Sequence, residues 1–146
     1  MEAALPVPVP AVPLRHRVEH VDTDAAGVVH FSRYASLMET AALEELERRG
    51  AGLGVFEAQG LELRVRELRI SYRGAARFRD GLLLVPGLEN VGPASLKLVV
   101  KVYREGSGPE PLLLASGSLD LAVVNRESGG PVCIPETLKA VLQQSP

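Results

Sequence analysis

The sequence predicts an α+β domain in which an antiparallel sheet covers one long buried helix. Three observations support this fold class. At 146 residues, the chain has the length of a single domain. Residues 32–49 carry apolar side chains at helical spacing. Four segments that alternate between apolar and polar residues follow this helix, and their short connections favour antiparallel pairing in a two-layer domain.

The N-terminal segment is rich in proline. Leu5–Pro13 reads LPVPVPAVP, and its four prolines remove backbone donors and favour extended geometry. We expect residues 1–14 to form a flexible arm, with a docking arm as the alternative, and residues 15–146 to form the single folded domain. Residues 15–21 favour a short strand. Asp22–Gly27 contains small residues and two aspartates, which favour a turn.

Residues 32–49 are predicted to form the central helix. Its apolar face is wide in the first half, which indicates deep burial. Gly50 is a typical C-terminal stop, and residues 51–60 favour a loop or a short helix. The apolar positions are Phe31, Tyr34, Ala35, Leu37, Met38, Ala41, Ala42 and Leu46.

The remaining chain is predicted to be mostly strand. The four expected strands cover residues 61–72, 81–91, 95–104 and 112–125. The apolar phase of the first of them slips by one residue near Arg66–Glu67, which is typical of a β-bulge. The second is expected to be interrupted at Pro86–Gly87. A short helix over residues 135–143 is expected to close the chain.

Charge and composition exclude several classes of protein. A net charge of −2, from 16 basic and 18 acidic residues, provides no basic surface for nucleic acid. Cys133 is the only cysteine, which excludes an internal disulfide and a cysteine zinc site. No apolar run has the length of a membrane span, and we expect a cytoplasmic protein. His16 and His20 have no third ligand nearby, so no metal site is expected.

One segment combines residues that suit chemistry at a carbonyl group. Residues 22–34 read DTDAAGVVHFSRY and lead into the predicted helix. A helix N-terminus offers unpaired N–H groups and a partial positive charge. A carbonyl group that undergoes acyl transfer needs a nucleophile or an activated water on one side and donors to its oxyanion on the other. An aspartate in the turn and the N–H groups of the helix could provide both.

This segment resembles the DxDxxGxV signature of the 4-hydroxybenzoyl-CoA thioesterase family of hotdog proteins. The similarity continues at Leu37–Glu39 and Ala41. Residues 72–80 resemble the family's Y-x-x-P-A-x-x-x-D strand turn, with Ala75 in place of the proline. The resemblance covers about residues 15–125. It implies a hotdog fold, in which an antiparallel sheet of about five strands wraps around one long central helix.

The resemblance also implies an activity, which is hydrolysis of an acyl-CoA or aroyl-CoA thioester to a carboxylic acid and a free thiol. The family's catalytic carboxylate corresponds to Asp24, acting as nucleophile or general base. Its oxyanion donor corresponds to the backbone N–H of Phe31. No metal or redox cofactor is implied, because coenzyme A is part of the substrate. Family members form dimers that commonly pair again, so we expect a homotetramer.

Further site residues follow from the same resemblance. The expected substrate contacts are Gly27, Val28, Val29, Tyr34 and, for a phosphate of coenzyme A, Arg77. His30 lies beside the expected oxyanion donor, where it either orients water or substrate or only fills the helix entrance.

Several alternatives stay open. Asp24 could instead cap the helix or stabilise the turn, and Asp22 is interpreted as structural. Glu39 is a second candidate carboxylate, although a buried ion pair with an arginine is the preferred interpretation. Three alternative functions remain. They are addition or removal of water at the β-carbon of an acyl thioester, hydrolysis of a chain bound to a carrier protein, and non-catalytic binding of an acyl thioester.

Overall fold

The computed structural model describes residues 12–106 and 108–144. Its elements follow the predicted order of strand, central helix, four strands and a closing helix. They are β1 (Leu14–Arg17), the 3-10 helix η1 (His20–Asp22), α1 (Arg33–Arg48), α2 (Leu53–Ala58), β2 (Leu61–Tyr72), β3 (Gly81–Val91), β4 (Ser95–Glu105), β5 (Leu112–Asn125) and α3 (Glu136–Gln143).

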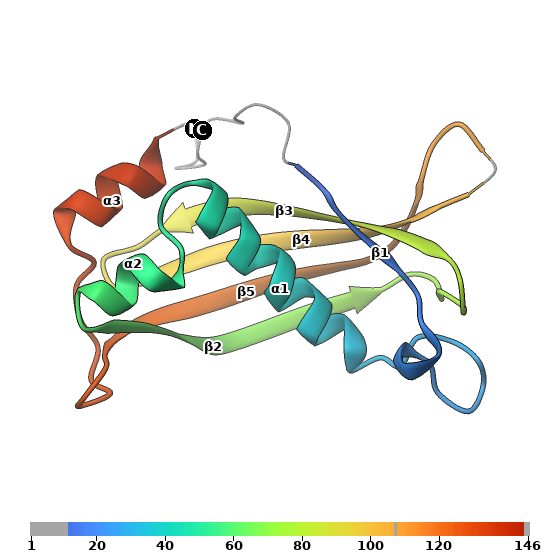
Figure 1. Cartoon of the computed structure of the whole chain (residues 1–146), viewed down its shortest axis with the longest axis horizontal. Coiled ribbons are helices and arrows are strands. Elements are labelled where there is room, and N and C mark those ends of the chain that lie inside the picture. The colour runs from blue at the N-terminus through green and yellow to red at the C-terminus, as the bar shows by residue number, and fades with distance from the viewer. Residues whose placement is uncertain (1–11, 107, 145–146) are drawn as a thin grey trace.

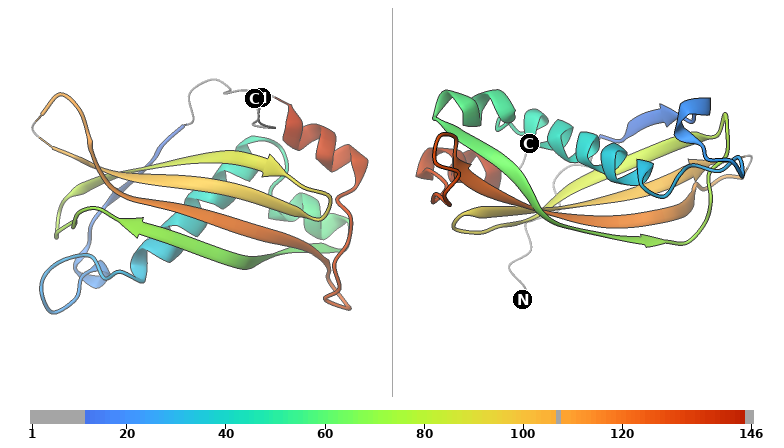
Figure 2. Two further views of the ribbon diagram at one scale, coloured as in Figure 1. Left: turned by 180° about the vertical axis from the view of Figure 1, so that it is seen from behind. Right: turned by 90° about the horizontal axis from the view of Figure 1, so that it is seen from below.

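The five strands form one antiparallel sheet in the order β1-β3-β4-β5-β2. The sheet curls around α1, and α2 lies on the same face (Figures 1 and 2). This confirms the predicted α+β hotdog arrangement. Met38, Ala41 and Ala42 of α1 are fully buried against the sheet. Gly117 of β5 allows this close approach, because a Cβ atom there would overlap the Met38 sulfur.

Two irregularities in the strands were expected, and one of them is confirmed. The register of β2 against β5 shifts between Val65 and Glu67, which is the predicted bulge. The predicted break at Pro86–Gly87 is wrong, since β3 continues through Pro86, which pairs with Val100. The pairing of β1 with β3 ends at Leu84. Pro86 therefore lies beyond the paired residues of β1, on a side of β3 where no strand within the described residues needs its missing N–H.

The predicted strand over residues 15–21 is shorter than expected. It ends at Arg17, and the chain then turns into η1 because the Asp22 carboxylate accepts a hydrogen bond from the Glu19 N–H at 2.8 Å. Of the arm predicted for residues 1–14, residues 1–11 lie outside the described part, and Leu14 already belongs to β1. No helix within the described ranges is long and apolar enough to cross a membrane.

Candidate active site

A small hairpin holds Asp24 in front of α1. Thr23 and Val29 form an isolated antiparallel bridge. Inside it, the Asp24 N–H donates to the Val28 carbonyl at 2.9 Å, and the Gly27 N–H donates to the Asp24 carbonyl at 3.0 Å. Gly27 has φ +82°, in the left-handed region that this tight loop requires. The turn predicted over residues 22–27 is thus confirmed for residues 24–27, whereas Asp22 belongs to η1.

The Asp24 carboxylate is exposed and only partly engaged. Its Oδ1 accepts a hydrogen bond from the Ala26 N–H at 2.8 Å and a longer one from the Val28 N–H at 3.4 Å. Its Oδ2 accepts no hydrogen bond from the residues that the structure describes. The side chain therefore stabilises the turn with one oxygen and leaves the other free to attack a carbonyl or to accept a proton.

The entrance of α1 presents an unused donor at Phe31. The Arg33 N–H donates to the His30 carbonyl at 2.9 Å, and the Ser32 N–H donates to the His30 ring at 3.2 Å. The Phe31 N–H makes no hydrogen bond within residues 12–106 and 108–144. Its carbonyl accepts a hydrogen bond from the Tyr72 hydroxyl at 2.8 Å, which anchors this residue to the end of β2. A fixed, unpaired N–H at a helix N-terminus suits an oxyanion.

His30 is exposed, and its ring is oriented by Ser32. Because the Ser32 N–H donates to Nδ1, that nitrogen carries a lone pair, and the neutral ring carries its proton on Nε2. The Ser32 hydroxyl lies 2.7 Å from the same nitrogen. The ring also stacks on Phe31, with 4.6 Å between centroids. His30 thus caps the helix entrance and presents an N–H to the solvent.

Asp22 fixes the base of the hairpin. Its side chain is 1% exposed, and it accepts hydrogen bonds from the Arg33 Nε at 2.6 Å and the Glu19 N–H at 2.8 Å, with the His16 Nε2 also at 2.8 Å. Burial alone would raise the pKa of this carboxyl, but these donors and the nearby His16 outweigh it and lower the pKa to about 2. Its carbonyl accepts the His30 N–H at 2.9 Å. These contacts support the structural role predicted for Asp22.

The other predicted contact residues have different positions. Gly27 and Val28 are half-buried in the hairpin, and Val28 forms a bridge with Arg77, which is exposed. Val29 and Tyr34 are instead core residues, 5% and 2% exposed. The Tyr34 ring packs edge-on against Tyr72, and its hydroxyl has no partner within the described residues. Burial raises the pKa of this phenol.

The expectation of a buried ion pair at Glu39 is wrong. Glu39 is exposed, and it has no ion pair within the described part of the chain. The buried carboxylate of α1 is Glu45, which pairs with Arg48 and Arg49, each at 2.8 Å. The spacing of three and four residues between these partners was the sequence signal for this pair.

Glu39 borders a cleft between α1 and β2. The cleft has a volume of about 300 Å³. It begins at Ser32, the residue after the proposed oxyanion donor, and Glu39 lies two helical turns further along α1. The lining residues are Ser32, Ala35, Ser36, Glu39, Val65, Leu68 and Leu119.

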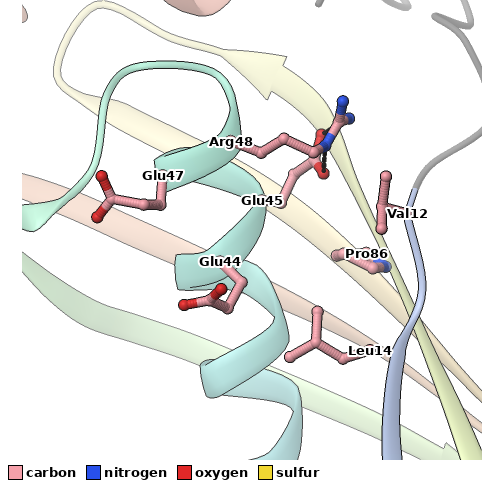
Figure 3. Close-up of a pocket in the computed structure, with 7 residues that line it drawn as sticks. All are labelled: Val12, Leu14, Glu44, Glu45, Glu47, Arg48 and Pro86. Atoms are coloured by element: carbon pink, nitrogen blue, oxygen red, sulfur yellow. Dashed lines mark hydrogen bonds and ion pairs between the residues drawn. The ribbon is translucent and has the colours of Figure 1, made fainter.

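Another cavity, of about 250 Å³, lies at the C-terminal half of α1. Figure 3 shows its lining, in which the side chains of Glu45 and Arg48 are joined by their ion pair. This cavity contains none of the predicted site residues. No group of three metal-ligating side chains is found in residues 12–106 and 108–144, and His16 contacts Asp22 instead.

Comparisons with known proteins agree on one family. The family model described as "Thioesterase-like superfamily" matches residues 18–142. A 1,4-dihydroxy-2-naphthoyl-CoA hydrolase of Synechococcus sp. (strain CC9605) is 29% identical over 142 residues, which cover 93% of this chain and 92% of that protein. A hypothetical protein from Thermus thermophilus, known from a crystal structure, is 32% identical with a TM-score of 0.79, over 89% of this chain and 95% of that one.

A more distant structure shares the fold. A 1,4-dihydroxy-2-naphthoyl-CoA thioesterase from Synechocystis has a TM-score of 0.77 at 18% identity, over 89% of this chain and 93% of its own.

Proposed function

Because this chain belongs to the thioesterase-like superfamily and is a thioester hydrolase, we propose that it hydrolyses aroyl-CoA thioesters with Asp24 and the Phe31 N–H. One observation carries this proposal. A partly free carboxylate and an unpaired helix N–H belong to the same small hairpin and helix entrance, which Asp22 and Tyr72 hold in place. The carboxylate can act as a nucleophile or base, and the N–H can donate a hydrogen bond to an oxyanion. Acyl transfer from a thioester needs both.

The chemistry assigns one role to each group. The thioester carbonyl oxygen accepts the Phe31 N–H, which stabilises negative charge as the carbonyl carbon is attacked. Asp24 Oδ2 either attacks that carbon, forming an anhydride that water then hydrolyses, or removes a proton from the attacking water. In both cases the C–S bond breaks, and the sulfur leaves as thiolate and takes up a proton. The products are the carboxylate and free coenzyme A.

The cleft beside Phe31 favours an aromatic acyl group. Val65, Leu68 and Leu119 form an apolar wall, while Ser32, Ser36 and Glu39 line one side of α1. The Ser32 hydroxyl already lies 2.7 Å from the His30 ring, and the Ser36 hydroxyl donates to the Arg33 carbonyl. An unbranched alkyl chain would offer no partner to the Glu39 carboxylate, which disfavours its binding. A ring that carries hydroxyl groups would use both kinds of surface. The similar Synechococcus protein is named for a dihydroxynaphthoyl thioester.

The cleft opens beside an edge of the sheet, which supports the dimer from which the expected homotetramer would be built. β2 is an edge strand, and its Val65 and Tyr72 side chains are each 46% exposed. A second copy that pairs along this edge would close the cleft with its own residues, in an isologous contact. Light scattering coupled to size-exclusion chromatography measures the mass of the assembly.

The function is tested by thiol release from a panel of aroyl-CoA and acyl-CoA esters, with wild type beside Asp24→Asn. Asparagine keeps the Oδ1 that accepts the Ala26 N–H, so the turn is retained, but it removes the charge and the free carboxylate oxygen. We expect a loss of at least about 100-fold in kcat. Asp120→Asn is the matched control, because Asp120 points away from the buried side chains of Leu119 and Leu121.

Each other outcome has a definite meaning. Equal activity of wild type and Asp24→Asn makes Asp24 structural and leaves Glu39 as the carboxylate to replace next. If only carrier-protein thioesters are hydrolysed, the substrate is a chain bound to a carrier protein. If the protein binds an acyl thioester without hydrolysing it, the function is non-catalytic binding. We expect the same rates with and without a metal chelator, since the proposed chemistry uses no cofactor. A cytoplasmic location remains a prediction.

A further inference from the structure

The arginines of this chain divide into two groups. Eight of the thirteen form ion pairs with carboxylates, whereas five have no carboxylate within 4.0 Å among the residues described. The five unpaired arginines are Arg17, Arg73, Arg77, Arg79 and Arg104. They lie at the end of β1, in the connection between β2 and β3, and near the end of β4, which meet at one end of the sheet (Figure 1).

Two of these arginines line a pocket of about 560 Å³. Its lining consists of Arg17, Val18, Glu19, His20, Phe78 and Arg79. The Phe78 ring is 49% exposed, and the Arg79 guanidinium lies 5.5 Å from its centroid. The His20 ring meets Phe78 edge-on with 6.3 Å between centroids. The pocket thus combines an accessible aromatic face with two cations and only one carboxylate, that of Glu19.

Arg79 is held in an unfavourable backbone conformation. Its φ is +77°, the one positive value found for a non-glycine residue in the described ranges. This region disfavours any side chain with a Cβ atom. The Arg79 N–H donates to the Val18 carbonyl at 3.0 Å, and the Val18 N–H donates to the Asp80 carbonyl at 2.9 Å. Glycine would adopt this backbone conformation without strain. The presence of arginine here instead points to a functional role for its guanidinium group.

The pocket lies next to the candidate active site. The bridge between Val28 and Arg77 joins the Asp24 hairpin to the segment that carries Phe78 and Arg79. On the other side, the His20 carbonyl accepts the Thr23 N–H at 3.1 Å. A ligand with its reacting group at Asp24 could therefore extend along this segment into the pocket.

The geometry points to this pocket as the subsite for the adenosine 3′,5′-bisphosphate end of coenzyme A. Arg17 and Arg79 contact the phosphates, and Phe78 stacks on the adenine base. The inference rests on the proposed function, because it takes an acyl-CoA as the substrate. It assigns the phosphate contacts to Arg17 and Arg79 rather than to Arg77, which does not line the pocket.

The test compares two substrates that differ only in the nucleotide. Steady-state kinetics are measured for an aroyl-CoA and for the corresponding aroyl-pantetheine thioester, with wild type, Arg17→Ala and Arg79→Gly. Exposed charge pairs are each modest, so we expect the ratio of kcat/KM between the CoA and pantetheine esters to fall about threefold to tenfold in each variant. Arg79→Gly suits the positive φ, so its fold is retained, which a melting curve verifies.

Arg126→Ala is the matched control. The Arg126 side chain is 53% exposed. Arg126 follows β5 at the end of the sheet opposite the pocket, next to Glu57 and Glu62. We expect its ratio to equal that of wild type. A fall in the ratio for this control, or an unchanged ratio in both pocket variants, overturns the subsite while leaving the hydrolase proposal intact.

A binding experiment separates the subsite from the activity. Adenosine 3′,5′-bisphosphate is titrated into wild type and into the double variant Arg17→Ala/Arg79→Gly by calorimetry. We expect binding to wild type and at least about tenfold weaker binding to the double variant. If wild type hydrolyses neither ester, the proposed function fails on that panel, and the titration still decides the pocket. No binding to wild type overturns the subsite.

Discussion

Replacing Asp22 with asparagine removes a buried negative charge that three donors hold. In the folded protein the pKa of this carboxyl is about 2, against an ordinary value of 3.8. At about 1.36 kcal/mol per pKa unit, the ionised carboxylate contributes roughly 2 kcal/mol to the free energy of unfolding at neutral pH. Because the folded pKa is lowered, this contribution is complete above about pH 5 and is lost as the pH falls toward 2. About half of it remains at pH 3.

Asp22→Asn is therefore expected to be about 2 kcal/mol less stable than wild type at pH 7. Asparagine keeps one acceptor oxygen but carries an NH₂ group in place of the other, so it cannot accept from both the Arg33 Nε and the Glu19 N–H with separate oxygens as the carboxylate does. Arg33 is partly exposed and can be hydrated, so the cost stays below that of a fully buried broken pair. Urea unfolding followed by circular dichroism at several pH values between 7 and 3 measures the difference.

The pH dependence is the decisive part of this experiment. The gap between Asp22→Asn and wild type should narrow as the pH falls toward 3, because the wild-type carboxylate is then gaining a proton. If the difference in free energy of unfolding between the two proteins stayed constant over this pH range, the reasoning would be refuted. Such a result would show that the shape of the side chain, and not its charge, stabilises the protein at this position. Asp120→Asn removes one partner of the exposed pair with Arg66 and is expected to change stability by less than about 1 kcal/mol.

Two further substitutions test other parts of the structure. Tyr72→Phe removes the hydrogen bond to the Phe31 carbonyl, and we expect kcat to fall about threefold to tenfold with little change in KM, because the oxyanion donor is less firmly placed; a change confined to KM would contradict this positioning role. Gly117→Ala places a methyl group against the Met38 sulfur and 3.3 Å from the Arg69 carbonyl, so we expect a loss of about 1–3 kcal/mol in urea unfolding. Unchanged stability would mean that Met38 moves aside freely.

The central helix and long strands were predictable because their periodicity is a local property of the chain. β2 and β5 have the predicted bounds, and the bulge at Glu67 was visible as a slip in apolar phase. Pro86 was misinterpreted because a proline breaks a strand only where its missing N–H has a partner to lose. Whether Pro86 has such a partner depends on where the pairing of β1 with β3 ends. The sequence of β3 alone does not reveal that position.

The candidate site was only partly predictable for a similar reason. The hairpin of Asp24 and Gly27 follows from turn chemistry, and its bonds are local in the chain. Tyr72 was missed as the support of the Phe31 carbonyl, because the two residues are 41 positions apart and only the fold brings them together. Glu39 was assigned to the interior because its neighbours on α1 are buried, yet it lies on the side of the helix that faces the open cleft.

The proline in β3 has a consequence for how copies of this protein can assemble. Beyond Leu84, the outer edge of β3 has no strand neighbour among the described residues, and Pro86 cannot donate a hydrogen bond there. An added strand would therefore pair poorly at that edge, whereas β2 contains no proline along its twelve residues. Strand addition is thus favoured on one side of the sheet only. Growth through a single edge stops after two copies meet, so this asymmetry favours closed assemblies and opposes filaments.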